Sequence, residues 1–436
     1  EYITYVDPDD IVVDGSYHKA LSILDKTDSD MLVGGTKRFN STKIWNSFIH
    51  SKSVKTNKFK TNLQESSELI WDSTSWNKLY KLSYMKNNNF YFPENMLYED
   101  LPVVTPALAK ASTIDVMADT MYLWRARDFG APSITQLSSN NPLTILDRLK
   151  ANTSVMKSLK SLNISEELIS FQAKKFLDFD TLMMFRRDRF DLFLPEQKRV
   201  LFYKLKEYLG LFSDKQLSNS SFENQVYFKK VLQMDDPADF NNLTLSFLRN
   251  ETNYYGQWIN NKWTLSSNLS NLTKSACSDD LNVQIKIEEV NFDLENLNIT
   301  GYLYAQYSDM SKIEYIRDAK ITLYNAKHNK INSNVGNIKF FKNENITSKF
   351  GYNKNHFIKD GADFNYDFSG YKLTIPLKNL VVDTDYLTIS IEVKIDNILV
   401  STELLNPVSG TYPRPKVKVS TALNTAFEIV YDSTSW

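Results

Sequence analysis

The chain has 436 residues, 42% of them hydrophobic and 24% charged, which is enough for two or three folded domains and excludes an intrinsically disordered protein. Its net charge of −1 excludes a strongly basic nucleic-acid-binding protein. The single cysteine, Cys277, excludes an intrachain disulfide and a cysteine-rich metal site, and the four histidines form no close pair. No apolar stretch approaches the ~18–20 residues of a membrane-spanning helix.

The first predicted element is a buried strand over residues 2–6, which ends in the acidic turn Asp7-Pro8-Asp9-Asp10. Clustered carboxylates repel one another unless a cation or solvent lies among them. Ligands of open α/β sheets bind at the carboxyl ends of strands, so the turn is a candidate metal site. An ordinary acidic turn explains it equally well when it is taken alone. A helix over 16–27 and a buried strand over 31–35 follow, and residues 36–66 read as polar and irregular.

A second acidic pair, Glu99-Asp100, lies at the start of a helix predicted to run to about residue 111. Either Pro102 or Pro106 fits the first turn of this helix. The helix dipole keeps a carboxylate at this position ionised. An ionised carboxylate in a pocket can accept a proton from an attacking hydroxyl. Taken alone, the pair is better explained as helix capping.

In a third segment, Arg125 and Arg127 precede a predicted loop over residues 129–135, which contains glycine, proline and hydroxyl side chains. Two arginines and such a loop can clamp a diphosphate, and the loop can close over it. Two solvated arginines are the simpler interpretation of this segment in isolation. The three segments together describe sugar transfer from a nucleotide donor, in which cations stabilise the leaving diphosphate and a base activates the acceptor.

The pattern changes twice further along the chain. Residues 137–254 read as helical, with Ser165 as a helix N-cap and a second helix bounded by Pro195 and Gly210. The basic run at 186–189 is either a solvated helix face or a contact for an anionic polymer. From residue 255 apolar residues alternate with period two, as in a β-sandwich. We therefore expect a multidomain α/β, all-α and all-β chain, divided as 1–136, 137–254 and 255–436.

The chemistry-bearing segments, in this order, resemble the inverting glycosyltransferase family 2, which has the GT-A fold. The resemblance rests on residues 1–10, 76–80, 92–101 and 125–135. The order of a GT-A domain, a helical linker and an immunoglobulin-like sandwich is also the layout of TarS-type wall-teichoic-acid glycosyltransferases. In this family, about three βαβ units of roughly 30 residues precede the DxD strand. We therefore expect this chain to hold the C-terminal portion of a GT-A domain and to turn over poorly alone.

The resemblance implies a role for each site residue. Asp9, with Asp7 beside it, would bind Mn²⁺ or Mg²⁺, and Asp100 would be the general base, with Glu99 near the donor sugar or acceptor. Substrate binding would involve Asp7, Lys78, Arg125, Arg127 and Ser133. Relatives can carry a histidine in the loop after the arginines, whereas this chain has Phe129-Gly130-Ala131, so a third metal ligand from that loop stays open.

The implied reaction is metal-assisted, inverting transfer of a hexose or N-acetylhexosamine from a nucleotide-diphosphate donor. The implied acceptor is a hydroxyl of an anionic surface polymer such as a poly(polyol phosphate) teichoic acid. No nucleic acid is implied, and we expect a cytoplasmic protein, with contact to the inner membrane face and a homo-oligomer left open. Two alternatives remain: a non-catalytic polymer-binding fragment, and part of a bifunctional teichoic or capsular polymer synthase.

Overall fold

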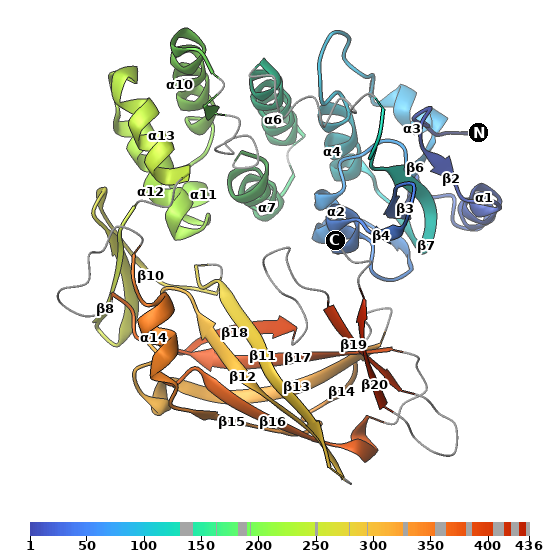
Figure 1. Cartoon of the computed structure of the whole chain (residues 1–436). Coiled ribbons are helices and arrows are strands. Elements are labelled where there is room, and N and C mark those ends of the chain that lie inside the picture. Colours follow the sequence, from blue (N-terminus) through green and yellow to red (C-terminus); the bar gives the residue numbers. More distant parts are fainter. Residues whose placement is uncertain are drawn as a thin grey trace. The chain divides into compact units, whose positions relative to one another are not determined.

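The computed structural model describes residues 1–130, 143–162, 164–181, 190–191, 193–248, 252–278, 280–293, 295–325, 330–353, 363–380, 386–403, 414–419 and 427–432 (Figure 1). The chain forms two compact units. The first contains residues 1–220 with 227–248, and the second contains residues 221–226 with 249–436. The α/β and helical regions share the first unit, and the domain boundaries expected at residues 136 and 254 stay predictions.

The α/β region is built on a curled mixed sheet with the strand order β1-β6-β3-β7-β2, in which β4 pairs with β3 and β5 with β7. Its strands are β1 (Tyr2–Ile3), β2 (Ile11–Val12), β3 (Met31–Phe39), β4 (Ile44–Asn46), β5 (Lys58–Thr61), β6 (Lys78–Lys81) and β7 (Ile114–Arg125). The central strands β3 and β7 run parallel, from Met31 opposite Ile114 to Phe39 opposite Arg125. The carboxyl ends of these two strands therefore lie at one edge of the sheet.

The helices of this region are α1 (Ser16–Thr27), α2 (Phe48–Ser53), η1 (Ser67–Trp71), α3 (Leu82–Asn87) and α4 (Leu101–Lys110). The bounds of α1 agree with the sequence prediction. Helix α4 has Pro102 in its first turn and Pro106 in its interior, where proline removes one backbone hydrogen bond. Burial compensates for this loss, since Val104 and Leu108 are fully buried in the core with Met31 and Ile114.

Two local predictions for the sheet are wrong. The strand expected over residues 2–6 pairs only at Tyr2 and Ile3, and the Thr4 hydroxyl instead donates to the carbonyl of Lys78 at 2.8 Å. The stretch at 36–66 is not irregular, because it contains the end of β3, then β4, α2 and β5. The end of β3 is polar, but its backbone pairs with β7 on one side and β4 on the other. Pairing with the neighbouring strands, rather than burial of apolar side chains, therefore determines the strand conformation at the end of β3.

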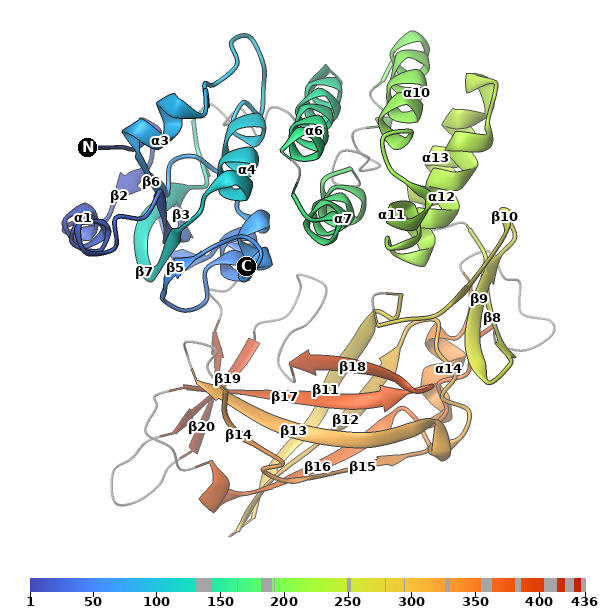
Figure 2. The same cartoon turned by 180° about the vertical axis from the view of Figure 1, so that it is seen from behind.

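The helical region contains α6 (Leu143–Ser161), α7 (Glu166–Lys175), η2 (Phe176–Asp180), α10 (Pro195–Leu209), α11 (Asp214–Ser218), α12 (Phe222–Gln233), η3 (Pro237–Asp239) and α13 (Phe240–Leu248). The Ser165 hydroxyl caps α7 by accepting from the N–H of Leu168 at 3.4 Å, as expected. Helix α10 begins at Pro195 and ends before Gly210, also as expected. Helix α6 packs beside α4 (Figure 2). The basic run at 186–189 lies outside the described residues.

The second unit contains three antiparallel sheets, with strand orders β10-β9-β8, β11-β12-β16-β15 and β14-β13-β17-β19-β20, and β18 pairs with β17. Its elements are β8 (Tyr254–Ile259), β9 (Lys262–Ser267), β10 (Ser270–Ser275), β11 (Val283–Phe292), β12 (Asn296–Ala305), η4 (Ile313–Tyr315), β13 (Ile316–Asn325), β14 (Lys330–Ser333), β15 (Asn337–Phe341), α14 (Glu344–Phe350), β16 (Gly370–Pro376), η5 (Leu377–Asn379), β17 (Tyr386–Ile395), β18 (Ile398–Glu403), β19 (Arg414–Val419) and β20 (Phe427–Asp432).

The predicted period-two alternation matches the strands of this unit. On β12, for example, Leu297, Ile299 and Leu303 are buried, and the residues between them are more exposed or have no side chain. The immunoglobulin-like character of these sheets stays a prediction. Within the described residues, no helix combines the length and apolarity that a membrane crossing needs.

Candidate active site

The acidic turn Asp7–Asp10 lies against the carboxyl end of β7. Strand β2, which follows the turn, pairs with Tyr122 and Leu123 of β7. The Arg125 N–H donates to Asp10 Oδ1 at 2.7 Å, and the Asp7 N–H donates to the Tyr122 hydroxyl at 3.0 Å. The turn is thus held at the sheet edge where parallel β3 and β7 end, which is where ligands of α/β sheets bind.

Both predicted phosphate-binding arginines contact this turn. The Nε and Nη2 atoms of Arg127 each lie 2.8 Å from Asp9 Oδ2, and both side chains are about one-third exposed. The Arg125 Nε donates to the backbone oxygen of Asp9, and its guanidinium lies 4.4 Å from the centre of the Phe39 ring. The structure therefore brings four predicted site residues together: Asp7, Asp9, Arg125 and Arg127.

Arg38 is a further cation at this edge that the sequence analysis missed. It lies opposite Trp124 in the parallel register, and its guanidinium stacks 3.9 Å from the centre of the Trp124 ring. Its Nη2 is 3.5 Å from the Arg125 carbonyl, and its Nε is buried without a hydrogen-bond partner among the described residues. Burial lowers the pKa of Arg38, and the negative charge of Asp10 opposes this shift. The end of β3 carried no strand signal that would have drawn attention to this residue.

The carboxylates of the turn are electrostatically strained. Burial raises the pKa of Asp7, and the charges of Asp9 and Glu99 add to this shift. Burial also raises the pKa of Asp10 to about 6, although hydrogen bonds from the Arg125 backbone and the Tyr122 side chain oppose this shift. A cation bound here would relieve this repulsion.

Asp7 and Asp9 fit the way in which proteins hold Mg²⁺ or Mn²⁺. Such ions are bound through one or two carboxylates, with waters and substrate phosphates as the other ligands. Among the residues that the structure describes, no group of three or more His, Cys, Asp or Glu side chains is arranged to hold a metal. Water and phosphate oxygens would therefore have to complete the coordination.

The predicted base, Asp100, lies immediately before α4. Its side chain makes no capping hydrogen bond to the helix, which argues against the capping interpretation. Instead its Oδ2 accepts from the N–H of Ser75 at 3.3 Å. Burial raises its pKa to about 6; the neighbouring Glu99 adds to the shift, while hydrogen bonds from Ser75 and the charge of Lys78 oppose it. A carboxyl with this pKa is mostly ionised at neutral pH and basic enough to accept a proton.

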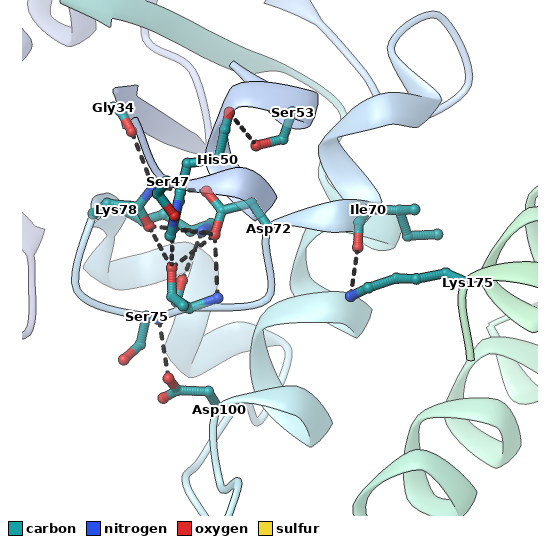
Figure 3. A network of polar contacts seen from close by, with 12 residues as sticks. Gly34, Ser47, His50, Ser53, Ile70, Asp72, Ser75, Lys78, Asp100 and Lys175 are labelled. Atoms are coloured by element: carbon teal, nitrogen blue, oxygen red, sulfur yellow. Dashed lines mark hydrogen bonds and ion pairs between the residues drawn. The ribbon is translucent and has the colours of Figure 1, made fainter. Parts of the chain in front are cut away.

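A buried polar network lies next to Asp100 (Figure 3). At its centre, Lys78 Nζ lies 2.9 Å from Asp72 Oδ1, and both side chains are fully buried. The Asn77 amide donates to Asp72 Oδ2 at 2.6 Å, and His50 Nε2 lies 3.4 Å from Asp72 Oδ1. Burial disfavours the ionised form of Asp72, but Lys78, His50 and Asn77 outweigh it, so its pKa is well below the ordinary value.

Lys78, which the resemblance assigned to substrate binding, is inside this network. Burial lowers its pKa, and the charge of Asp72 opposes that shift. Its ammonium also donates to the Thr74 carbonyl at 2.6 Å and to Asn77 Oδ1 at 2.9 Å. Any contribution of Lys78 to substrate binding is therefore indirect, through its hydrogen bonds to segment 72–77. Ser133, also assigned to substrate binding, lies outside the described residues.

No protein-family model and no curated protein matches this chain. Among solved structures, the crystal structure of S. aureus TarS aligns with 99% of this chain and 70% of that chain, with a TM-score of 0.53 and 13% sequence identity. Crystal structures of S. aureus TarS 1-349, alone and in complex with UDP-GlcNAc, cover 63% of this chain and 74% of those chains, with TM-scores of 0.48 and identities of 17% and 18%. The fold of the chain is thus similar to that of TarS.

Proposed function

We propose that this chain carries the acceptor and diphosphate side of an inverting glycosyltransferase site. The donor would be a nucleotide-diphosphate sugar, and the acceptor a hydroxyl of an anionic poly(polyol phosphate). The observation that carries the proposal is the contact of Asp9 with Arg125 and Arg127, in the turn that also contains Asp7, at the carboxyl ends of β3 and β7. The TarS-like fold and the raised pKa of Asp100 support it.

In this reaction an acceptor oxygen attacks the anomeric carbon from the face opposite the diphosphate. Asp100 takes the hydroxyl proton, so that the nucleophile carries no positive charge as the new C–O bond forms. The bond between the anomeric carbon and the diphosphate oxygen breaks, and negative charge develops on the phosphate. Arg125 and Arg127 would stabilise this charge. A divalent ion at Asp7 and Asp9 would add charge stabilisation at the same phosphates.

The ion pair between Asp9 and Arg127 suits an exchange of partners on ligand binding. Both groups are one-third exposed, so the pair contributes little to stability and can open at little energetic expense. A donor diphosphate would then accept from the guanidinium, and the freed Asp9 carboxylate would be available to a cation. Donor and metal binding are therefore expected to strengthen each other.

The first test is transfer of labelled N-acetylglucosamine from UDP-N-acetylglucosamine to poly(ribitol phosphate). The protein should be expressed from its complete reading frame and assayed with Mn²⁺, with Mg²⁺ and with a chelator. We expect polymer labelling with the metal ions and its loss in the chelator. Binding of the polymer without labelling, across a panel of UDP-hexoses and UDP-N-acetylhexosamines, would favour the non-catalytic polymer-binding alternative. A cytoplasmic location, membrane contact and self-association stay predictions.

A further inference from the structure

We infer that Asp72 and Lys78 are positioning residues. Their buried ion pair fixes the conformation of segment 72–77, and this segment in turn fixes the position of Asp100 relative to the acidic turn Asp7–Asp10. The inference rests on the proposed function, because it assigns Asp100 the role of base. Neither Asp72 nor Lys78 is exposed, so their effect has to act through the segment rather than on a substrate.

The ion pair itself points to a role in geometry. Removing two charges from water is expensive, and a hydrophobic pair of similar volume is often as stable or more stable. Here the expense is offset by hydrogen bonds within one short segment. Asp72 Oδ1 accepts from the Thr74 hydroxyl at 2.7 Å and from the Thr74 N–H at 3.2 Å. A buried polar network with this many mutual bonds favours a single arrangement of its backbone.

The network is anchored to the sheet and to a helix behind it. The Asn77 amide donates to the Gly34 carbonyl in β3 at 2.9 Å. His50 in α2 lies 3.1 Å from the Thr74 hydroxyl through Nε2 and 2.7 Å from the Ser47 hydroxyl through Nδ1 (Figure 3). Segment 72–77 is therefore anchored on strand β3 through Asn77 and on helix α2 through Thr74.

From this anchored segment, two adjacent residues reach the two halves of the site. The Ser75 N–H donates to Asp100 Oδ2 at 3.3 Å. The ring of Trp76 stacks on Tyr122 with 4.3 Å between ring centres and 20° between planes. The Tyr122 hydroxyl in turn accepts from the N–H of Asp7. One short segment thus links the base to the metal-binding turn, and errors of about 1 Å in such a relation can reduce a rate about 100-fold.

Lys78 of this pair also acts on Asp100 electrostatically. Within the described part of the chain, the charged and titratable groups that act on Asp100 include Glu99 beside it, Lys78 in β6 and the Tyr80 hydroxyl in the same strand. Of these, Lys78 favours the ionised base and Glu99 opposes it. Loss of the Lys78 charge, together with a looser Ser75 N–H contact, raises the pKa of Asp100. Because the base must be ionised, the acid limb of the pH–rate profile then moves to higher pH.

The test compares wild-type protein with the double variant D72N/K78M, in which both charges are removed together so that neither remains buried alone. The matched control is D28N/K81M, which also removes both charges of an ion pair. Lys81 lies in β6, the strand that contains Lys78, and its ammonium is 2.6 Å from the largely exposed carboxylate of Asp28. The measurements are kcat, the KM for UDP-N-acetylglucosamine, the pH–rate profile, and hydrogen exchange of peptides covering 72–77 and the first turn of α4.

We expect D72N/K78M to lose about 10- to 100-fold in kcat with an unchanged donor KM. Its acid limb should move to higher pH, and its exchange should be faster in both peptides. D28N/K81M should behave as wild type in all four measurements. Wild-type kcat, acid limb and exchange in the folded double variant would overturn the inference. If wild-type protein transfers no sugar, the proposed function fails, and the exchange comparison still decides whether the pair holds the segment.

If the double variant does not fold, T74V is the second variant. It removes the hydroxyl that bonds to Asp72, Asn77 and His50 but leaves the ion pair and the Thr74 carbonyl in place. A smaller shift of the acid limb in the same direction, with faster exchange over 72–77, supports the inference. A wild-type profile and wild-type exchange in T74V would contradict it.

Discussion

Two ion pairs of the α/β region, Asp9 with Arg127 and Asp72 with Lys78, have similar chemistry and opposite surroundings. Asp9 and Arg127 are each one-third exposed at the end of the parallel strands, whereas Asp72 and Lys78 are fully buried. The exposed pair is weakly held and can exchange partners with a ligand. The buried pair is costly to break, because either partner alone would be an uncompensated buried charge. Burial, rather than residue type, separates the groups suited to binding a ligand from those suited to holding the site in shape.

The largest effect on stability is expected when only one partner of the buried pair is removed. Lys78→Met should destabilise the first unit by about 3–5 kcal/mol, because Asp72 is left charged and buried. Adding Asp72→Asn should recover much of that loss. Urea denaturation followed by tryptophan fluorescence measures it, since Trp76 is buried next to the network. If the Lys78→Met protein were as stable as wild type, the buried pair would be no more important for folding than the exposed pair, which would contradict this comparison.

Breaking the exposed pair should reverse the pattern, with little effect on folding and a large effect on the reaction. Arg127→Ala should change stability by less than about 1 kcal/mol, while kcat/KM for the nucleotide sugar falls about 10- to 100-fold, roughly 1.5–3 kcal/mol. The matched control is Arg199→Ala, which removes an exposed arginine 3.9 Å from Glu196 on α10. A comparable loss of transfer in both variants would count against a specific role for Arg127.

A pH titration sharpens the comparison at Asp100. Its pKa is raised to about 6, so we expect the proposed base to become protonated, and kcat/KM to fall, as the pH drops through that value. For Asp72 the folded-state pKa lies well below the ordinary value. Its contribution to stability is therefore present at neutral pH and is lost only as the pH falls below about 4 and through the folded pKa. Activity should thus be lost on acidification well before the fold, and simultaneous loss would argue against this assignment.

The smallest expected effect is that of Arg38. Arg38→Met keeps an apolar side chain against Trp124 but removes the positive charge that acts on Asp10. Donor KM should rise about fivefold, roughly 1 kcal/mol, with no change in the melting temperature. Steady-state kinetics at low and high salt measure this, because a partly exposed charge is screened at high ionic strength. An unchanged KM at low salt would exclude Arg38 from the donor site.

Elements with strong local signals were predictable from the sequence. The bounds of α1, the cap at Ser165 and the span of α10 follow from periodicity and end residues. The end of β3 was not predicted as a strand because its residues are polar. Its strand conformation depends on pairing with β7, which is remote in sequence, and with β4, which follows it. For the same reason Arg38 was overlooked. The burial of Lys78 could not be predicted, because it depends on Asp72 and His50, which the fold rather than the sequence places beside it.

Asp100 is the proposed base, and Asp100→Asn removes the carboxylate that would accept the acceptor's proton. The measurement is transfer from UDP-N-acetylglucosamine to poly(ribitol phosphate), with the dissociation constant for the donor determined on the same protein. We expect transfer to fall by about 10²- to 10⁴-fold while donor affinity stays near the wild-type value, since the base is needed only for the chemical step. Near-wild-type transfer by this variant would contradict this expectation.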